Sequence, residues 1–339
     1  MPFPDFEKEL LSAAQFDGSV PADRFSWSFS RERLFRRCRR AFFIGSFLSQ
    51  GGWDPLVHPL IRSAYMEKHT LPFRLWLTRT VQSGIAAGLK KAVVLPPDSR
   101  RKAFSSGCLR FLSKNLFDLE FSLEHGEYLS DPKRPCVREC LDGQTARFPE
   151  LRRQALDSFS AAYAALMKAP WFHDILRLDV MHFRFDDELI SILFEQWPVW
   201  FSPGLVFFSG KQFNMILCSA SETVCPSGEE PGTEDDLPDP AGVTAALFEM
   251  HIRSKWQREP PLARLFRFGP DGADVEEIRP APGIRTLIRN GAGEMFSLIR
   301  PDGSARFGDF PKTTDPIRCA GCQYADTCRL LDQWADRHC

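Results

Sequence analysis

The chain of 339 residues is longer than one average domain, and a hydrophobic content of 43% with 30 phenylalanines provides ample material for a buried core. No apolar run of about eighteen residues occurs, and the first residues lack the basic and apolar regions of a secretory signal. The formal net charge is −1, so the chain is not a polycation and only local basic patches could contact phosphates. We therefore expect a cytoplasmic protein without membrane contact.

Helical patterns dominate the first half of the chain. A serine-rich start at 26–30 predicts the capped entry to an arginine-rich helix that continues to about residue 43 and contains Cys38. Apolar residues then recur at helical spacing near 56–95, 101–125 and 147–168.

Short β-rich runs follow from about residue 176. They cover 176–185, 189–194, 198–208 and 212–219, and the last two are joined by a hairpin signal at 209–211. The remaining predicted elements are a Gly-, Pro- and acid-rich surface loop at 222–242, a helix at 242–257, a second hairpin around 269–272 and a helix near 283–299.

This order predicts an α+β fold, with a large helical N-terminal part followed by a small mixed sheet flanked by helices. We divide the chain into an N-terminal extension (1–25), a first cysteine-bearing helix (26–53), a helical region (54–175), an α+β core (176–300) with the acidic loop 222–242, and a C-terminal cysteine segment (301–339).

Four of the ten cysteines predict a metal centre. Without a secretory signal, cysteines are expected to stay reduced or to bind metal. Cys319, Cys322 and Cys328 form a C-x2-C-x5-C run, and Cys38 at the other end of the chain would be the fourth ligand. One distant cysteine with a C-terminal triplet favours a [4Fe-4S] cluster, with zinc as the alternative. Such a centre would join the two ends of the chain.

Basic residues are concentrated beside Cys38. Residues 31–40 carry six arginines, of which Arg33, Arg36, Arg37 and Arg40 are our candidates for contact with DNA or RNA. The alternative is that these arginines are solvated or pair with acidic residues of the chain itself.

These features together resemble the iron–sulfur branch of the PD-(D/E)XK nucleases, which includes RecB-type and AddB-type nuclease domains and the CRISPR-adaptation nucleases. Residues 38–43 (Cys-Arg-Arg-Ala-Phe-Phe) are similar to the C-P-R-x-[FY]-[FY] opening of that branch, with Arg39 in place of Pro. Gly51-Gly52-Trp53 and the segment 310–315 before the cysteine triplet also resemble one bacterial subgroup. The resemblance implies a PD-(D/E)XK core with an iron–sulfur centre that joins the termini.

The residues that catalyse the reaction in that family are replaced in this chain. The family hydrolyses phosphodiesters with carboxylates that hold Mg²⁺ and a lysine on the adjacent strand. The matching positions hold Gln82 for a histidine, Gly204 for the aspartate of P-D-L, Leu217 and Ser219 for the acid and the lysine of D-x-K, and Thr244 for the glutamine of Q-x-x-x-Y. The resemblance therefore implies a degenerate nuclease that does not use Mg²⁺ or Mn²⁺.

Our leading hypothesis is a nucleic-acid-binding or scaffolding component of a DNA-processing or defence machine, with a protein partner in a larger complex. The alternative is an active metal-dependent DNA exonuclease or endonuclease with relocated ligands, for which Glu195 and Asp186-Asp187-Glu188 are the candidates. A third hypothesis is a redox sensor in which the cluster reports oxygen or iron status.

Overall fold

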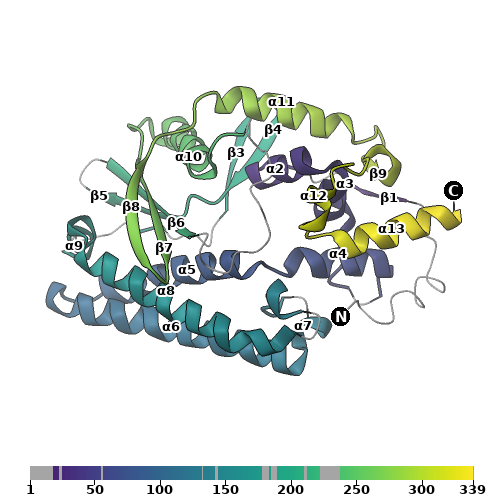
Figure 1. The fold of residues 1–339 in the computed structure, drawn as a ribbon. Helices are drawn as coiled ribbons and strands as arrows, with labels where there is room; N and C mark the ends of the chain where they lie inside the picture. Colours follow the sequence, from purple (N-terminus) through teal and green to yellow (C-terminus); the bar gives the residue numbers. More distant parts are fainter. Residues whose placement is uncertain are drawn as a thin grey trace.

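The computed structural model describes residues 18–22, 25–54, 56–131, 133–141, 144–177, 183–184, 189–209, 212–221 and 237–338. It confirms the α+β class, with a large helical part before a small mixed sheet (Figure 1). In these ranges, every helix is too short or too polar to cross a membrane.

The helices, taken in chain order, confirm the predicted helical segments. They are α2 (Phe29–Arg37), α3 (Arg39–Phe43), the π-helix η1 (Ile44–Leu48), α4 (Pro59–His69), α5 (Phe73–Val93), α6 (Pro97–His125), α7 (Glu127–Ser130), η2 (Arg138–Cys140), η3 (Gln144–Arg147), α8 (Phe148–Lys168), α9 (Pro170–Arg177), α10 (Pro240–Trp256), α11 (Ile284–Ser297), η4 (Phe307–Asp309), α12 (Pro316–Ala320) and α13 (Ala325–His338).

The strands form one mixed sheet and two small ribbons. They are β1 (Ser19–Pro21), β2 (Phe183–Arg184), β3 (Ile190–Phe194), β4 (Trp197–Phe201), β5 (Leu205–Ser209), β6 (Gln212–Ala220), β7 (Leu262–Gly269), β8 (Gly272–Ile278) and β9 (Ser304–Arg306). The sheet has the order β2-β5-β6-β7-β8, and the ribbons are β1-β9 and β3-β4. The β5–β6 and β7–β8 pairs are antiparallel, as the two predicted hairpins require, whereas β6 and β7 are parallel and α10 lies between them in the chain.

The sheet separates two hydrophobic cores because successive side chains of a strand point to opposite faces. Phe207 and Ile216 face the core formed with α5, α6, α8 and α9. Val206 and Met215 face the second core, which includes α10 and α11. Figure 1 shows α5, α6 and α8 along one side of the sheet and α10 on the other.

Three predicted elements differ from the structure. The helix expected to run through Cys38 is broken at that residue, which is extended between α2 and α3. The prediction of a strand from residue 176 is wrong at its start, because Leu176 belongs to α9. Phe172, Ile175 and Leu176 recur at helical spacing and pack together into the core. The run 198–208 is divided between β4 and β5 by a turn in which Gly204 has a φ of +69°. Residues 222–236 of the expected loop lie outside the described residues.

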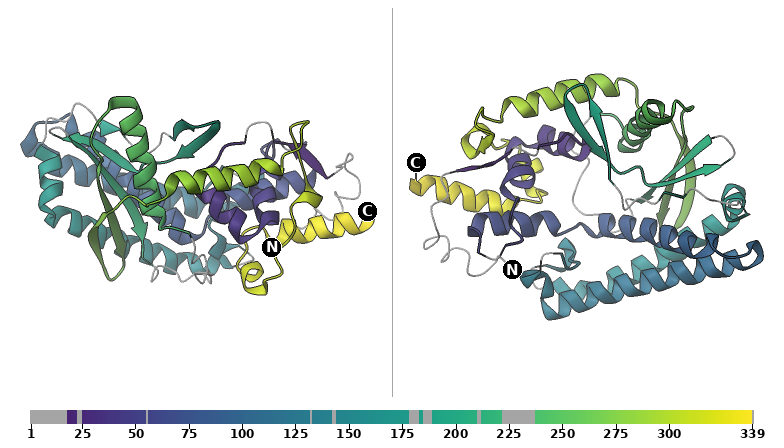
Figure 2. Two further views of the ribbon diagram at one scale, coloured as in Figure 1. Left: turned by 90° about the horizontal axis from the view of Figure 1, so that it is seen from above. Right: turned by 180° about the vertical axis from the view of Figure 1, so that it is seen from behind.

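The two ends of the chain are held together by ordinary protein contacts. Strand β1 pairs with β9, and Arg40 of α3 donates from Nε to the carbonyl oxygen of Phe310 at 2.8 Å and from a terminal nitrogen to Asp332 of α13 at 3.0 Å. Phe43 and Phe310 are both fully buried and their rings lie 5.2 Å apart. Figure 2 shows α13 beside α4, at the end of the molecule away from the five-stranded sheet.

A buried carboxylate joins the first helix to α11. Glu32 has no exposed surface, and its two oxygens accept from Nε1 of Trp27 at 2.8 Å and from Nε of Arg36 at 2.9 Å. A Cβ at Gly291 of α11 would lie 1.8 Å from Glu32 Oε2. The glycine therefore lets α11 approach a charged group whose position is fixed by two hydrogen bonds.

We expect Gly291→Ala to lower the free energy of unfolding by about 2 kcal/mol, because the new methyl group forces the buried Glu32 away from its donors. Gly293→Ala is the matched control, since it lies on the same helix with no atom within 4 Å of the new Cβ. It should be neutral or stabilise by about 0.5 to 1 kcal/mol, as alanine is the better helix former. Denaturant unfolding of both variants measures the difference, and equal effects would contradict this role of Gly291.

Candidate functional site

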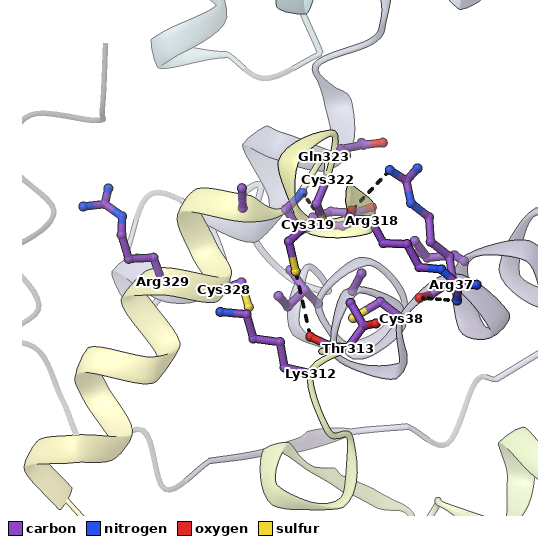
Figure 3. A pocket seen from close by; sticks show the side chains of 15 residues that line it. Arg37, Cys38, Lys312, Thr313, Arg318, Cys319, Cys322, Gln323, Cys328 and Arg329 are labelled. Carbon is purple, nitrogen blue, oxygen red and sulfur yellow. Dashed lines mark hydrogen bonds between the residues drawn. The ribbon is translucent and has the colours of Figure 1, made fainter. Parts of the chain in front are cut away.

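The four cysteines predicted as metal ligands line one cavity. Cys38, Cys319, Cys322 and Cys328 are among the residues that line a space of about 140 Å³ between the junction of α2 and α3 on one side and helices α12 and α13 on the other. Figure 3 shows the sulfurs of Cys38, Cys319 and Cys328 directed into this space. We call it the cysteine cavity.

The break between α2 and α3 places Cys38 at the cavity. The residue is extended, with φ −164° and ψ 117°, so the chain turns between two helices at the cysteine itself. Its amide still donates to the carbonyl oxygen of Leu34, and its own carbonyl accepts from the amide of Phe42. Both backbone polar groups of Cys38 are therefore hydrogen-bonded although the helical path is interrupted.

Local capping positions the C-terminal cysteines. The Asp315 side chain accepts from the amides of Ile317 and Arg318 and so begins α12, which presents Cys319. The amide of Cys322 donates to the carbonyl of Cys319, and the amide of Tyr324 points at the Cys322 sulfur at 3.4 Å. An amide directed at a sulfur stabilises a thiolate or a metal-bound sulfur, as in iron–sulfur sites.

Two arginines connect the walls of the cavity across the chain ends. Arg37 donates to the carbonyl oxygens of Arg318 and Gly321, and Arg318 donates to those of Arg36 and Arg37. These reciprocal contacts hold α12 and the residue directly after it against the end of α2, next to Cys38.

Burial favours the protonated form of two of the free thiols, those of Cys322 and Cys328. It raises the pKa of Cys322, and it raises the pKa of Cys328 to about 11. Such thiols become ligands only when metal binding displaces their protons. The cavity thus offers four sulfur donors, and within the described ranges no group of three or more Cys, His, Asp or Glu side chains has the geometry that holds a single metal ion.

The positions that match the nuclease motif lie mostly together on the sheet. Gly204 directly precedes β5 and lies against Leu217 of β6, and Ser219 follows on the same face of that strand. Gln82 of α5 accepts from the backbone amide of Cys218 at 3.3 Å. Thr244 lies on α10, where its hydroxyl donates to the Pro240 carbonyl of its own helix.

The backbone at Gly204 leaves no room for the aspartate that the family motif would place there. A Cβ would lie 2.7 Å from the carbonyl oxygen of Ile216 and 2.7 Å from Cδ2 of Leu217. Residues with a side chain also rarely adopt a φ of +69°. An acidic side chain at this position would require β5 and β6 to move apart.

The ligands considered for an active nuclease do not form a metal site within the described residues. Glu195, in the β3–β4 turn, is paired with Arg289 of α11, which lowers the pKa of the carboxyl group. Asp186, Asp187 and Glu188 lie outside the described residues.

The four candidate arginines have two different environments. Arg36 pairs with Glu32 and Glu294, and Arg40 is buried against Phe307 and paired with Asp332. Arg33 and Arg37 instead line a large groove. Lys68 and Arg79 line the same groove, and the sequence analysis missed them because they lie on later helices, away from the arginine run.

A third residue that the sequence did not reveal is Glu67, next to the cysteine cavity. Its Oε1 accepts from the amide of Thr327 at 3.1 Å, and among the described residues Oε2 has no hydrogen-bond partner. Burial raises the pKa of this carboxyl group to about 7, against the lowering effect of the hydrogen bonds from Thr327. Glu67 therefore couples the packing of α4 on α13 to pH.

Comparison with protein-family models, curated proteins and solved structures gives no match for this chain.

The free energy of unfolding should fall as pH rises through the range between the ordinary carboxyl pKa and about 7. In that range Glu67 is protonated in the folded chain and ionised in the unfolded chain, so unfolding releases a proton and higher pH favours it. The loss is at most about 3 kcal/mol. Glu67→Gln should remove this component, and denaturant unfolding of both proteins at pH 5 and pH 8 would show it. An identical pH dependence in the variant would refute the assignment.

Gly204→Ala should lower the free energy of unfolding by about 3 kcal/mol, through backbone strain together with the clash against β6. Gly283→Ala is the control, because Gly283 has a φ of +73° but no atom within 4 Å of a new Cβ. Gly283→Ala should lower the free energy of unfolding by about 1 kcal/mol, because it introduces backbone strain without a clash. Equal losses in thermal or denaturant unfolding would mean that crowding at Gly204 does not matter.

Proposed function

We propose that this chain is a PD-(D/E)XK nuclease-like protein that holds a [4Fe-4S] cluster on Cys38, Cys319, Cys322 and Cys328, lacks conventional nuclease activity, and binds nucleic acid as a component of a larger DNA-processing or defence machine. The observation that carries the proposal is that four cysteines from opposite ends of the chain line one cavity.

The size of the cysteine cavity favours a cluster over zinc. Zinc with four cysteines is held at about 2.3 Å from each sulfur, which leaves no space between the ligands. A cavity of roughly 10 to 15 Å³ already admits one water molecule. The cysteine cavity, at about 140 Å³, has room for a group of several atoms. When bound, the cluster would supply a covalent cross-link between the two chain ends.

The proposal of a nuclease-like core rests on the sequence resemblance and on where the motif positions lie. Gly204 and Leu217 are neighbours on the β5–β6 hairpin, within a small mixed sheet that helices cover on both faces. Gln82 contacts the same hairpin strand from α5. The resemblance predicts that a histidine and the acidic ligands would meet in this region.

The proposed lack of nuclease activity rests on the chemistry of the replacements. Mg²⁺ takes oxygen ligands in near-octahedral geometry. Glycine at 204 and leucine at 217 supply no side-chain oxygen, and the hydroxyl of Ser219 cannot replace the lysine ammonium group. The crowding at Gly204 also opposes reversion to aspartate.

Anaerobically purified protein should absorb broadly in the visible range and contain about four iron and four acid-labile sulfide per chain. Cys322→Ser should lose this absorption and lower the melting temperature, because cross-linking such a long loop stabilises by on the order of 4 kcal/mol in the disulfide analogy. Cys218→Ser is the control, since Cys218 is also half-buried but lies on β6, outside the cavity.

If the purified protein contains zinc and no iron or sulfide, the cysteines hold zinc and the proposed cluster is wrong. A full complement of iron with an unchanged melting temperature in Cys322→Ser would overturn the cross-linking role. Cleavage of DNA by the purified protein with Mg²⁺ or Mn²⁺ would overturn the proposed lack of nuclease activity.

A further inference from the structure

A large groove of the described structure has an excess of positive charge. It has a volume of about 880 Å³ and lies between α2, α4, α5, α6 and the segment 133–136. Seven lysines and arginines line it together with a single carboxylate, Asp118. The whole chain, in contrast, has 43 basic and 44 acidic residues, so the charge of this surface is not that of the average surface. We call it the basic groove.

The cations reach the groove from separate elements. Arg31, Arg33 and Arg37 come from α2, Arg79 comes from α5, and Lys68 comes from the last turn of α4. Lys133 and Arg134 follow α7 in the chain and complete the lining. A charge distribution of this extent fits a ligand that carries several anionic groups along its length.

Several of these charges are not neutralised by carboxylates. Arg31 donates to the carbonyl and hydroxyl oxygens of Ser26, and Lys68 donates from Nζ to the Ser49 hydroxyl at 3.1 Å, so both are held by neutral groups. In the described part of the chain, no carboxylate forms an ion pair with the Arg79 guanidinium. Arg134 of the groove does pair with Glu127 and Asp131, and Arg36, Arg39 and Arg40 each pair with Glu294 or Asp332 outside the groove.

The cations of the groove also act on one another. Burial and the charge of Arg31 lower the pKa of Lys68. Burial lowers the pKa of His69, as do the charges of Lys68, Arg79 and Lys133. Like charges that face the same hollow repel one another in the free protein, and a polyanion in the hollow would remove that repulsion.

The basic groove is a different surface from the nuclease-like hairpin. Arg74 and Thr78 bind the backbone of Ala220, and Gln82 binds that of Cys218, so this face of α5 is covered by β6. Leu75, Arg79 and Ser83 follow these residues by one position each and line the groove. Successive residues of a helix are rotated by about 100° around its axis, so the face of α5 against β6 and the face in the groove are different.

We propose that the basic groove binds the backbone of single-stranded nucleic acid. This inference deepens the proposed function and rests on its nucleic-acid-binding part. A concave surface with cations on several walls can enclose one extended strand, whereas a duplex presents its phosphates on a broad convex cylinder. Leu75, which is 40% exposed, and Phe111 give the groove an apolar portion against which base faces can lie.

The test is fluorescence anisotropy with a labelled single-stranded oligonucleotide of about 20 nucleotides, at about 50 and 200 mM salt. The variant is Arg79→Glu with Lys133→Glu, two exposed residues whose reversal leaves the packed core intact. The control is Arg153→Glu with Arg253→Glu, which makes the same charge change at exposed positions of α8 and α10. Iron content and thermal unfolding are measured on every protein.

We expect the groove variant to bind at least about tenfold more weakly at the lower salt concentration, with a salt slope smaller by about 1.4 for two lost phosphate contacts. The control variant should bind within about twofold of the wild type. Equal affinities of the groove and control variants would overturn the groove as the binding site. Tighter binding of a duplex of the same sequence, or displacement of the strand by inorganic phosphate at an equal concentration of phosphate groups, would overturn the single-stranded assignment.

The outcomes also separate this inference from the proposed function. If the wild type binds the strand and the groove variant binds it equally well, the groove is wrong while nucleic-acid binding stands. If cluster-loaded wild type does not bind the strand at about 50 mM salt, where phosphate contacts are strongest, nucleic-acid binding itself is wrong.

Discussion

The contact between the two ends of the chain is the constraint on which the rest of the structure depends. Strand β1 pairs with β9, and the buried Arg40 bridges the first helices to Phe310 and Asp332 near the end of the chain. These contacts involve no cysteine, yet they hold α3 and α13 on opposite sides of the cysteine cavity. The protein matrix therefore places the four cysteines along one cavity, and a bound metal centre would reinforce a closure that the fold already makes.

The sequence predicts most helices and strands, and it fails where tertiary contacts determine the local backbone conformation. The long helices and both hairpins follow from apolar spacing and turn residues, which are local signals. The break at Cys38 has no such signal, because basic and aromatic residues continue at helical spacing on both sides. At the break, the carbonyl groups of Arg318 in α12 and of Gly321 directly after it accept from Arg37 and hold the end of α2, which is a contact between distant parts of the chain. Leu176 shows the reverse case, in which an apolar, β-like run is helical because Phe172 and Ile175 face the core with it.

The sequence indicates the cysteines of the candidate site, but it does not indicate which cations line the basic groove. The spacing of Cys319, Cys322 and Cys328 is a local pattern, and one distant cysteine completes it. The basic groove collects Arg33, Lys68 and Lys133 from segments that are far apart in the chain, so no run of charge indicates it. The arginine run at 31–40 is only a partial guide to the groove, since it does not show which of its side chains form ion pairs with carboxylates in the folded chain.

The cysteine cavity and the basic groove share one wall, which would link the proposed metal centre to the proposed binding surface. Leu34 and Arg37 of α2, together with Gln323 and Tyr324, line both spaces. Arg37 donates to the carbonyl groups of Arg318 and Gly321, which flank Cys319 in the chain, so a group bound to Cys319 and Cys322 would also act on the end of α2. Loss of that group would free one wall of the groove while leaving the cations of α4 and α5 in place. The proposed cluster would in this way influence the proposed nucleic-acid binding without touching the ligand, because it would reinforce the position of the helix that carries Arg31, Arg33 and Arg37.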